Sequence, residues 1–476
     1  MNQNEQTVSH AVSKESMAFR ISAIVGLGAM LATLLVYSAA ITPFQSFETL
    51  ASFVGTFAET SLSFAAVFSF IFIVAALFGK QVPHKVLLVL GGVLYSASAF
   101  IFLHFVWYGN EDIVTTLAGG ALAGMADVMM CLLWGRIFMR FTLKSALVNV
   151  SIACIVSAVI YWLLTVLPPF GSIIVFAVCS LVAAALPAVL DVPTVEAAAT
   201  SAQLHAQKAL DTLRSFADVI VTPALGLLFF AFAMGTMRSA FTERFETYLF
   251  AVVFAALILI VYALTHTRPF TMRALQQTFV PLLAIILLAA TSISTPLKQG
   301  SEVLMFLTFL LYLFAAILTL SILCAIANAA EFTPDLIFGM AVLLFALASI
   351  TGLKVSEMID EEMIGVAITI TTTIYAFAMV LFSYFKWQRN TAWDNGENPG
   401  KAEGDSLSDR CEKIAAEYRL TAREQEILSY LAEGHSGAYI SEVLFISPNT
   451  ARTHIHNIYK KLEVSSREDI LKMTRA

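Results

Sequence analysis

Long stretches of apolar residues alternate with short polar segments through most of this 476-residue chain. A helix needs about 20 apolar residues to cross the hydrocarbon core of a bilayer. Helices are expected rather than barrel strands, because none of the stretches alternates between apolar and polar residues. We predict twelve transmembrane helices, at 19–41, 59–79, 84–108, 112–135, 144–167, 170–190, 216–237, 246–265, 273–294, 301–328, 334–353 and 362–385.

The overall composition supports a membrane protein. Hydrophobic residues make up 58% of the chain, charged residues only 13%, and the mean hydropathy is +0.80. A soluble globular protein carries about 25% charged residues. So little charge cannot cover a folded core of this size with a polar surface, so most of the chain is expected to lie in lipid.

The basic residues predict the orientation of these helices. If the N-terminus is cytoplasmic, the inner segments up to residue 390 contain 13 Lys and Arg residues and the outer loops contain 4. Basic residues accumulate in cytoplasmic loops. We therefore expect a multi-pass protein of a prokaryotic plasma membrane, with both termini in the cytoplasm.

The C-terminal end has a different character. The last 76 residues contain 11 of the 28 Lys and Arg residues and 12 acidic residues. The segment 390–409 is rich in Asn, Gly, Asp and Glu, so it cannot bury a core. The sequence predicts an all-α protein with four parts: a cytoplasmic N-terminal segment (1–18), a transmembrane domain (19–387) that contains a cytoplasmic connector (191–215), a flexible linker (388–410) and a four-helix domain (411–476).

Charged residues within the predicted spans are few, and Asp127 is the clearest of them. Its carboxylate could reach the membrane surface or bond a neighbouring helix, or it could line a cavity and contact a ligand. Gly120 and Gly124 form a GxxxG spacing, which favours tight helix packing. Proton-driven transporters usually place several ionisable groups at mid-membrane, so the scarcity of charge favours sensing over pumping.

The arrangement of the spans resembles the major facilitator superfamily. Six spans precede the connector and six follow it, over roughly residues 17–387. The loop at 78–85 occupies the place of that family's signature loop but lacks its acidic residue and Arg-rich pattern. The resemblance implies a central ligand cavity between two halves.

The C-terminal domain shows the boundaries of short amphipathic helices. Thr421 and Glu424 form a capping box that begins a helix, and Gly434 ends it. A second helix is expected at about 436–444 and a fourth from about Ser466. The third begins after the cap Ser447, with a proline at its first position.

The third helix is predicted to have two unlike faces. Ile455, Ile458 and Leu462 make an apolar face, while no acidic residue occurs from 447 to 462. A polar, basic outer face on the second helix of a tightly turned pair is typical of a helix-turn-helix that reads DNA. The exposed polar residues are Asn449, Arg452, Thr453, His456 and Lys460.

This domain resembles the LuxR-type (NarL-type) helix-turn-helix. The residues that carry the likeness are Leu420-Thr421, Arg423-Glu424, Ala432-x-Gly434, Ile446-Ser447-x-x-Thr450, His454 and Lys460-Lys461-Leu462. The resemblance implies binding to double-stranded promoter DNA, with Glu424 and Ile440 as scaffold. It places base contacts at Arg452, Thr453 and His456, and phosphate contacts at Thr450, Lys460 and Lys461. We add the helix cap Ser447 and the outer-face residue Asn449 to the predicted DNA-binding set.

Two positions depart from the family pattern. Gly437, Ala438 and Tyr439 stand before Ile440 where the family usually has a polar residue and a phosphate-binding lysine. Ala451 replaces the usual valine. The missing lysine leaves open a tail that docks to protein instead of DNA.

These patterns lead to two hypotheses for function. The first is a membrane-bound, one-component regulator that senses a small ligand or membrane signal, contacts lipid, and binds promoter DNA as a homodimer. The second is a small-solute transporter with a regulatory tail. An enzyme is not expected, because the chain has no P-loop, GxSxG or metal-ligand spacing. We predict no catalytic residue, metal, cofactor or disulfide framework.

Overall fold

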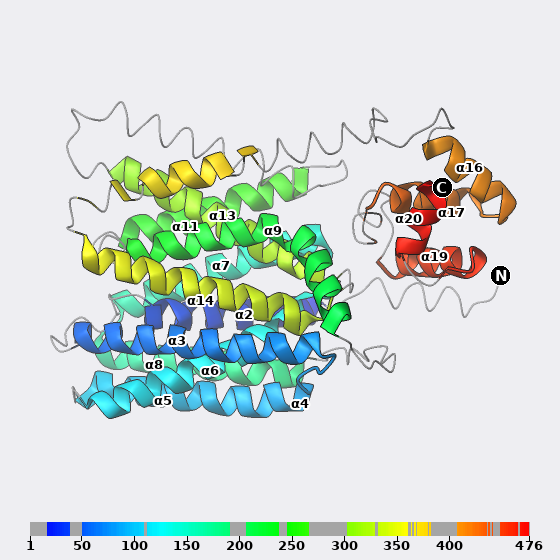
Figure 1. Ribbon diagram of the computed structural model, residues 1–476. Helices are drawn as coiled ribbons and strands as arrows, with labels where there is room; N and C mark the ends of the chain where they lie inside the picture. Colours follow the sequence, from blue (N-terminus) through cyan, green and yellow to red (C-terminus); the bar gives the residue numbers. More distant parts are fainter. Residues whose placement is uncertain are drawn as a thin grey trace.

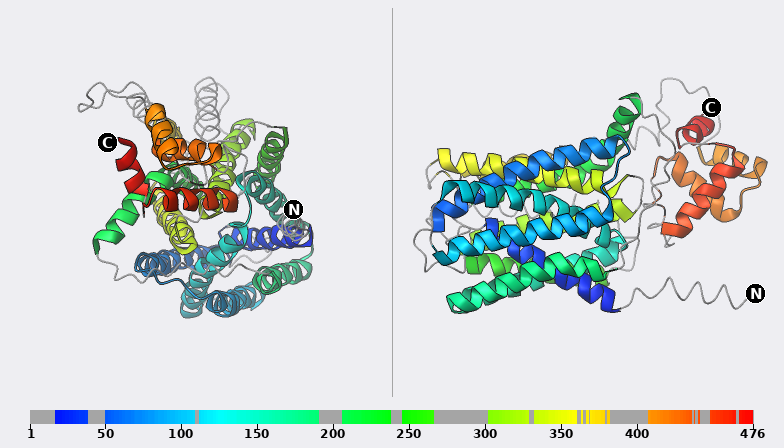
Figure 2. Two further views of the ribbon diagram at one scale, coloured as in Figure 1. Left: turned by 90° about the vertical axis from the view of Figure 1, so that its right-hand side faces the viewer. Right: turned by 90° about the horizontal axis from the view of Figure 1, so that it is seen from below.

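The protein is all-α in the part that the computed structural model describes. That part comprises residues 17–38, 50–108, 112–190, 206–237, 245–265, 302–328, 332–359, 407–435, 448–464 and 467–475, together with scattered residues between 363 and 381 and residues 437 and 440. The helices form a bundle and a separate group of short C-terminal helices beyond one end of it (Figures 1 and 2).

The bundle consists of long apolar helices that lie side by side (Figure 1). Its N-terminal half contains α2 (Met17–Ser38), α3 (Leu50–Leu77), α4 (His84–Val86), the π-helical turn η1 (Leu87–Gly91), α5 (Gly92–Tyr108), α6 (Ile113–Phe138), α7 (Leu143–Val166) and α8 (Pro169–Val189). Its C-terminal half contains α9 (Ala206–Thr236), α11 (Phe245–Thr265), α13 (Glu302–Asn328) and α14 (Pro334–Met358).

Nine helices in the described part are long and apolar enough to cross a membrane. Their outer surface exposes large apolar side chains, such as Phe70, Phe100 and Phe250, which are 59%, 71% and 64% exposed. Apolar residues at such positions are stable in lipid. The protein is therefore a multi-pass membrane protein.

Three of the twelve predicted spans are not among these nine. The span at 273–294 lies outside the described residues, and the one at 362–385 is described only in part. The span at 216–237 coincides with α9, whose described apolar stretch, Ala224–Thr236, is shorter. The complete count of twelve stays a prediction.

Glycines allow the helices of each half to pack closely. A Cβ on Gly120 of α6 would lie 2.8 Å from the Phe57 carbonyl oxygen of α3, and one on Gly124 would overlap the Ser61 carbonyl oxygen. The packing role predicted for this GxxxG pair is confirmed. In the C-terminal half, a Cβ on Gly235 of α9 would lie 2.5 Å from the Ser349 carbonyl oxygen of α14.

A buried ion pair joins the two halves at the end of the bundle that faces the C-terminal helices. Arg136 of α6 donates through Nε and Nη2 to Oδ1 of Asp335 in α14, at 3.1 and 2.5 Å, and the two side chains are 8% and 1% exposed. Val82, in the loop after α3, accepts from Arg136 Nη2 at 2.9 Å and donates its N–H to Asp335 Oδ2 at 2.9 Å. Both carboxylate oxygens are thus satisfied.

The C-terminal helices surround a core of their own. They are α16 (Leu407–Glu417), α17 (Ala422–Ala432), α19 (Pro448–Lys461) and α20 (Arg467–Arg475). Helix α16 begins inside the segment predicted as linker and contributes Cys411 and Ile414 to this core. The core residues are Cys411, Ile414, Ile427, Leu428, Leu431, Ala432, Ile440, Ile458, Leu462 and Ile470. We refer to this unit as the tail domain.

Gly124→Ala should lower the thermal unfolding temperature of the purified protein in detergent. The added methyl forces α3 and α6 apart, and overpacking of this kind costs about 1–3 kcal/mol. Gly171→Ala is the matched control, because a Cβ there meets no atom closer than 3.4 Å. Equal unfolding temperatures for the two variants would contradict the close packing of α6 on α3.

Arg136→Met should destabilise the bundle more than the double variant Arg136→Met/Asp335→Leu. The single change leaves the Asp335 carboxylate buried without a cation, which costs about 3–5 kcal/mol, whereas replacing both partners by apolar residues is often neutral. Thermal unfolding of the three proteins in the same detergent makes the comparison. A double variant as unstable as the single one would mean that packing, not charge, makes Arg136 important.

Candidate DNA-binding surface and membrane cavity

Helix α17 begins at the predicted capping box. Thr421 Oγ1 accepts from the Glu424 N–H at 3.3 Å, and Glu424 Oε2 accepts from the Thr421 N–H at 2.8 Å. At the other end of the helix, Gly434 has a φ of +88°, a conformation that glycine adopts without strain. The capping box and the stop at Gly434 are both confirmed.

Lys461 connects the end of α19 to the start of α17. Its Nζ lies 2.6 Å from Glu424 Oε2 and 3.3 Å from the Arg419 carbonyl oxygen. Burial raises the pKa of the Glu424 carboxyl, but the Lys461 ammonium and the donors of Thr421 outweigh it, so the pKa lies below its ordinary value. Sequence reasoning gave Lys461 only a phosphate contact and missed this bridge, although an acid at the capping box offered a partner.

The predicted recognition helix is α19. It begins at Pro448, as expected, and Ile458 and Leu462 are buried in the tail core. Ala451 is 1% exposed and faces inward. The polar residues of the opposite face are exposed: Arg452, Thr453, His456 and Lys460. Ser447 lies outside the described residues, as do the side chains of Asn449 and Thr450.

Arg452, on the exposed face of α19, contacts the membrane bundle. Arg452 Nη2 donates to the Asn328 carbonyl oxygen, at the C-terminal end of α13, at 2.7 Å. Asn328 Nδ2 in turn donates to the carbonyl oxygen of Met139, just past α6, at 2.5 Å. The predicted base-reading arginine is thus engaged by the bundle, close to the end of α6 that carries Arg136. No sequence pattern indicated Asn328.

The bundle encloses a cavity of about 420 Å³ between its two halves. Its described lining comes from α2, α3, α6 and α7 of the N-terminal half and from α9, α11, α13 and α14 of the C-terminal half. Asp127 is part of this lining, together with Cys131, Trp134 and Phe138, which follow it along one face of α6. The central cavity implied by the architecture is therefore present.

Asp127 bonds a neighbouring helix and also lines the cavity. Its contact with a ligand stays a prediction. Its Oδ2 accepts from Ser61 Oγ of α3 at 3.4 Å. Its Oδ1 is buried and has no hydrogen-bond partner in the described part.

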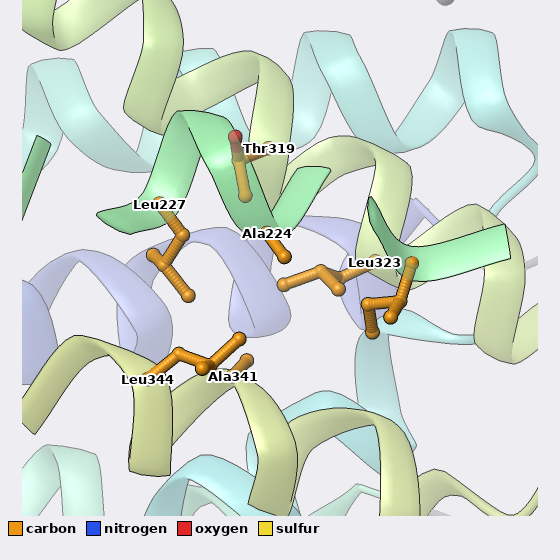
Figure 3. Close-up of a pocket in the computed structure, with 7 residues that line it drawn as sticks. Ala224, Leu227, Thr319, Leu323, Ala341 and Leu344 are labelled. Atoms are coloured by element: carbon orange, nitrogen blue, oxygen red, sulfur yellow. The ribbon is translucent and has the colours of Figure 1, made fainter. Parts of the chain in front are cut away.

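The C-terminal half contributes an almost purely apolar wall. Figure 3 shows side chains of α9, α13 and α14 around a smaller pocket. Leu227, Leu323 and Ala341 lie close together there, and Thr319 is the labelled residue that has a hydroxyl group. These four residues also line the central cavity. This wall therefore offers a ligand dispersion contacts and little hydrogen bonding.

Comparison with known proteins identifies the tail domain. Residues 418–474 match the family of bacterial regulatory proteins of the luxR family. The tail is a LuxR-type helix-turn-helix domain. The matched residues cover the capping box, α19 and most of α20, so the family assignment rests on the same residues as the sequence resemblance.

Curated relatives match short stretches of this chain. The chain is 40% identical over 87 residues to the uncharacterized response regulatory protein YgeK of Escherichia coli, covering 17% of this chain and 58% of that protein. It is 54% identical over 48 residues to the transcriptional regulatory protein LiaR of Bacillus subtilis, covering 10% of this chain and 23% of LiaR. The chain spans less than two thirds of these relatives.

The bundle is similar to a solved membrane transporter. The human organic anion transporter MFSD10 (TETRAN) aligns with 77% of this chain and 99% of its own, with a TM-score of 0.53 and 16% sequence identity. At this identity the likeness shows the fold alone. The protein therefore joins a LuxR-type DNA-binding domain to a membrane domain with a major-facilitator-like fold.

Lys461→Met should destabilise the isolated tail domain at neutral pH, whereas Lys460→Met should not. Without Lys461, Glu424 stays buried and loses its cation, at a cost of about 1–3 kcal/mol. Because the folded pKa of Glu424 is lowered, this stabilisation is fully present above the ordinary value of 4.5 and is lost as the pH falls through the folded pKa. Urea unfolding at several pH values measures it.

The difference between the wild-type tail and Lys461→Met should therefore shrink in acid. Equal urea midpoints for the Lys460 and Lys461 variants at neutral pH would show that Lys461 has no structural role.

Proposed function

We propose that this protein is a membrane-bound, LuxR-type transcription regulator whose membrane domain senses a small ligand and controls DNA binding by the tail. The contact between Arg452 and the Asn328 carbonyl oxygen carries the proposal. An arginine held at the end of a membrane helix would have to leave that helix to enter the major groove and donate to a guanine edge. The bundle and DNA therefore compete for one side chain.

The path from the cavity to this contact is short. Phe138 lines the cavity, Met139 follows it, and the Met139 carbonyl oxygen accepts from the Asn328 side chain. A ligand that shifts the end of α6 would change the surface on which Arg452 rests. A ligand moves such an equilibrium only by binding the two states unequally.

On DNA, α19 would enter the major groove as recognition helices do. Arg452, Thr453 and His456 would read base edges, and Lys460 would neutralise a phosphate. Ser447, Asn449, Thr450 and Lys461 complete the proposed DNA-binding set. Lys461 would have to contact a DNA phosphate while it also forms the ion pair with Glu424. The tail would act as a homodimer, with two chains meeting in the membrane.

The topology that supports this arrangement is the one predicted from the sequence. Twelve spans in two groups of six, with both termini in the cytoplasm, would place the tail where DNA is. The proposed parts are 1–18, the transmembrane domain 19–387 with its connector 191–215, a linker within 388–410 and the tail.

A second candidate function is transport of a small solute, with the tail reporting occupancy. The cavity lined by both halves favours it, as does the fold shared with a protein that is named an organic anion transporter. Transport would require the cavity to open alternately to both sides of the membrane, whereas sensing requires only binding and a change in DNA affinity.

Arg452→Ala should abolish discrete promoter binding by the full-length protein in cells. Loss of one base-reading arginine costs about 1–3 kcal/mol and relaxes specificity at one base pair. Genome-wide DNA crosslinking and pull-down compares the wild type with Arg452→Ala and with Lys413→Ala, which removes the same charge from an exposed site on α16.

Peaks that survive in Arg452→Ala would contradict the docking of α19. No peaks in the wild type would favour a protein-docking tail and the transport hypothesis.

A further inference from the structure

The described lining of the central cavity is mostly apolar, with a few hydroxyl groups and one carboxylate. Among its described lining residues, Asp127 is the only charged side chain, and none is Lys, Arg or His. Arg136, a buried cation further along the same helix, forms an ion pair with Asp335 and donates to the Val82 carbonyl oxygen. The described cavity wall therefore contains nothing that would bind an anion by charge.

Asp127 is poorly satisfied by the protein itself. Its carboxylate receives one long hydrogen bond, 3.4 Å from Ser61 Oγ, and Oδ1 receives none in the described part. An ionised carboxylate in an apolar environment is costly unless it is paired and hydrogen-bonded. The most effective partner is a cation that enters with a hydrogen-bond donor or a delocalised positive charge.

The walls around Asp127 suit a large hydrophobic cation. Trp134 and Phe138 extend from Asp127 along α6, and Tyr37, Phe230 and Phe345 come from other helices. Aromatic faces attract cations, and an apolar wall gains from contact with a hydrophobic body. A volume of about 420 Å³ is in the range of pockets that hold small organic molecules.

We propose that the ligand of this cavity is a lipophilic organic monocation, with Asp127 as its counter-ion. The proposal rests on the proposed sensing function and names the chemical class of what is sensed. This class is opposite in charge to the organic anions for which the structural neighbour is named. The ion pair forms inside a low-dielectric cavity, where charge complementarity gives strong discrimination between ligands.

The test compares two probes of matched size and shape and of opposite charge, tetraphenylphosphonium and tetraphenylborate. Binding of each to the full-length protein in neutral-lipid nanodiscs is measured by calorimetry, with empty nanodiscs subtracted. The wild type should bind the phosphonium saturably and should bind the borate no more than empty nanodiscs do.

Two variants locate the site. Asp127→Asn keeps the shape of the side chain and should weaken phosphonium binding by at least about tenfold, because it removes the buried counter-charge. Asp112→Asn is the matched control at the start of the same helix. Asp112 caps α6 by accepting from the Val114 N–H at 3.2 Å and from the Thr115 hydroxyl, and it does not line the cavity. This variant should bind as the wild type does.

Equal binding of the two probes, or phosphonium binding that Asp127→Asn leaves unchanged, would overturn the proposal. If Asp127→Asn fails to fold, the proposal is tested by the wild type alone, by comparing its binding of the phosphonium with its binding of the borate. Promoter peaks that persist while the cavity shows no charge preference would overturn the ligand class and leave the regulator intact. Cation binding without promoter peaks would support the ligand class and reject the regulator.

Discussion

The buried pair between Arg136 and Asp335 connects the two halves of the membrane domain at the end that faces the tail. Two charges out of water are tolerated because Val82 supplies both a carbonyl acceptor and an N–H donor, which completes the hydrogen bonding of the pair. The pair lies one turn or less from residues that line the cavity, such as Gly135 and Phe138. The shape of the cavity near Gly135 and Phe138 therefore depends on this ion pair, and so does the position of the adjoining ends of α6 and α14.

The helix ends held in this way form the surface on which the DNA-binding domain rests. Asn328 joins α13 to the end of α6 through the Met139 carbonyl oxygen and presents its own carbonyl oxygen to Arg452. A change in the cavity has a physical route to α19 that runs through the hydrogen bonds of Asn328 and does not require a signal to cross the linker. The segment that joins the two domains would then serve only to keep the tail close to its docking surface.

Local patterns were the part of this structure that the sequence could predict. The capping box at Thr421, the stop at Gly434 and the apolar face of α19 depend on residues a few positions apart. The close helix packing at Gly120 and Gly124 could also be predicted, because small residues four positions apart favour close approach of two helices. Asp335 pairs with Arg136, and Asn328 with Arg452, across more than a hundred residues, so no spacing rule could find them. The family resemblance predicts a phosphate contact for Lys461. Its contact with Glu424 depends on how α19 crosses α17, which no local pattern predicts.

The competition between the membrane domain and DNA for Arg452 is tested most directly by a distance between the two domains. Fluorophores incorporated at Lys80, at the end of α3 that faces the tail, and at Lys413 of α16 report energy transfer in the full-length protein in nanodiscs. The account predicts high transfer without DNA and a clear loss of transfer on adding operator DNA, with no change on adding scrambled DNA. Transfer that stays unchanged at saturating operator DNA would show that α19 reads DNA without leaving the membrane domain, and would contradict the account.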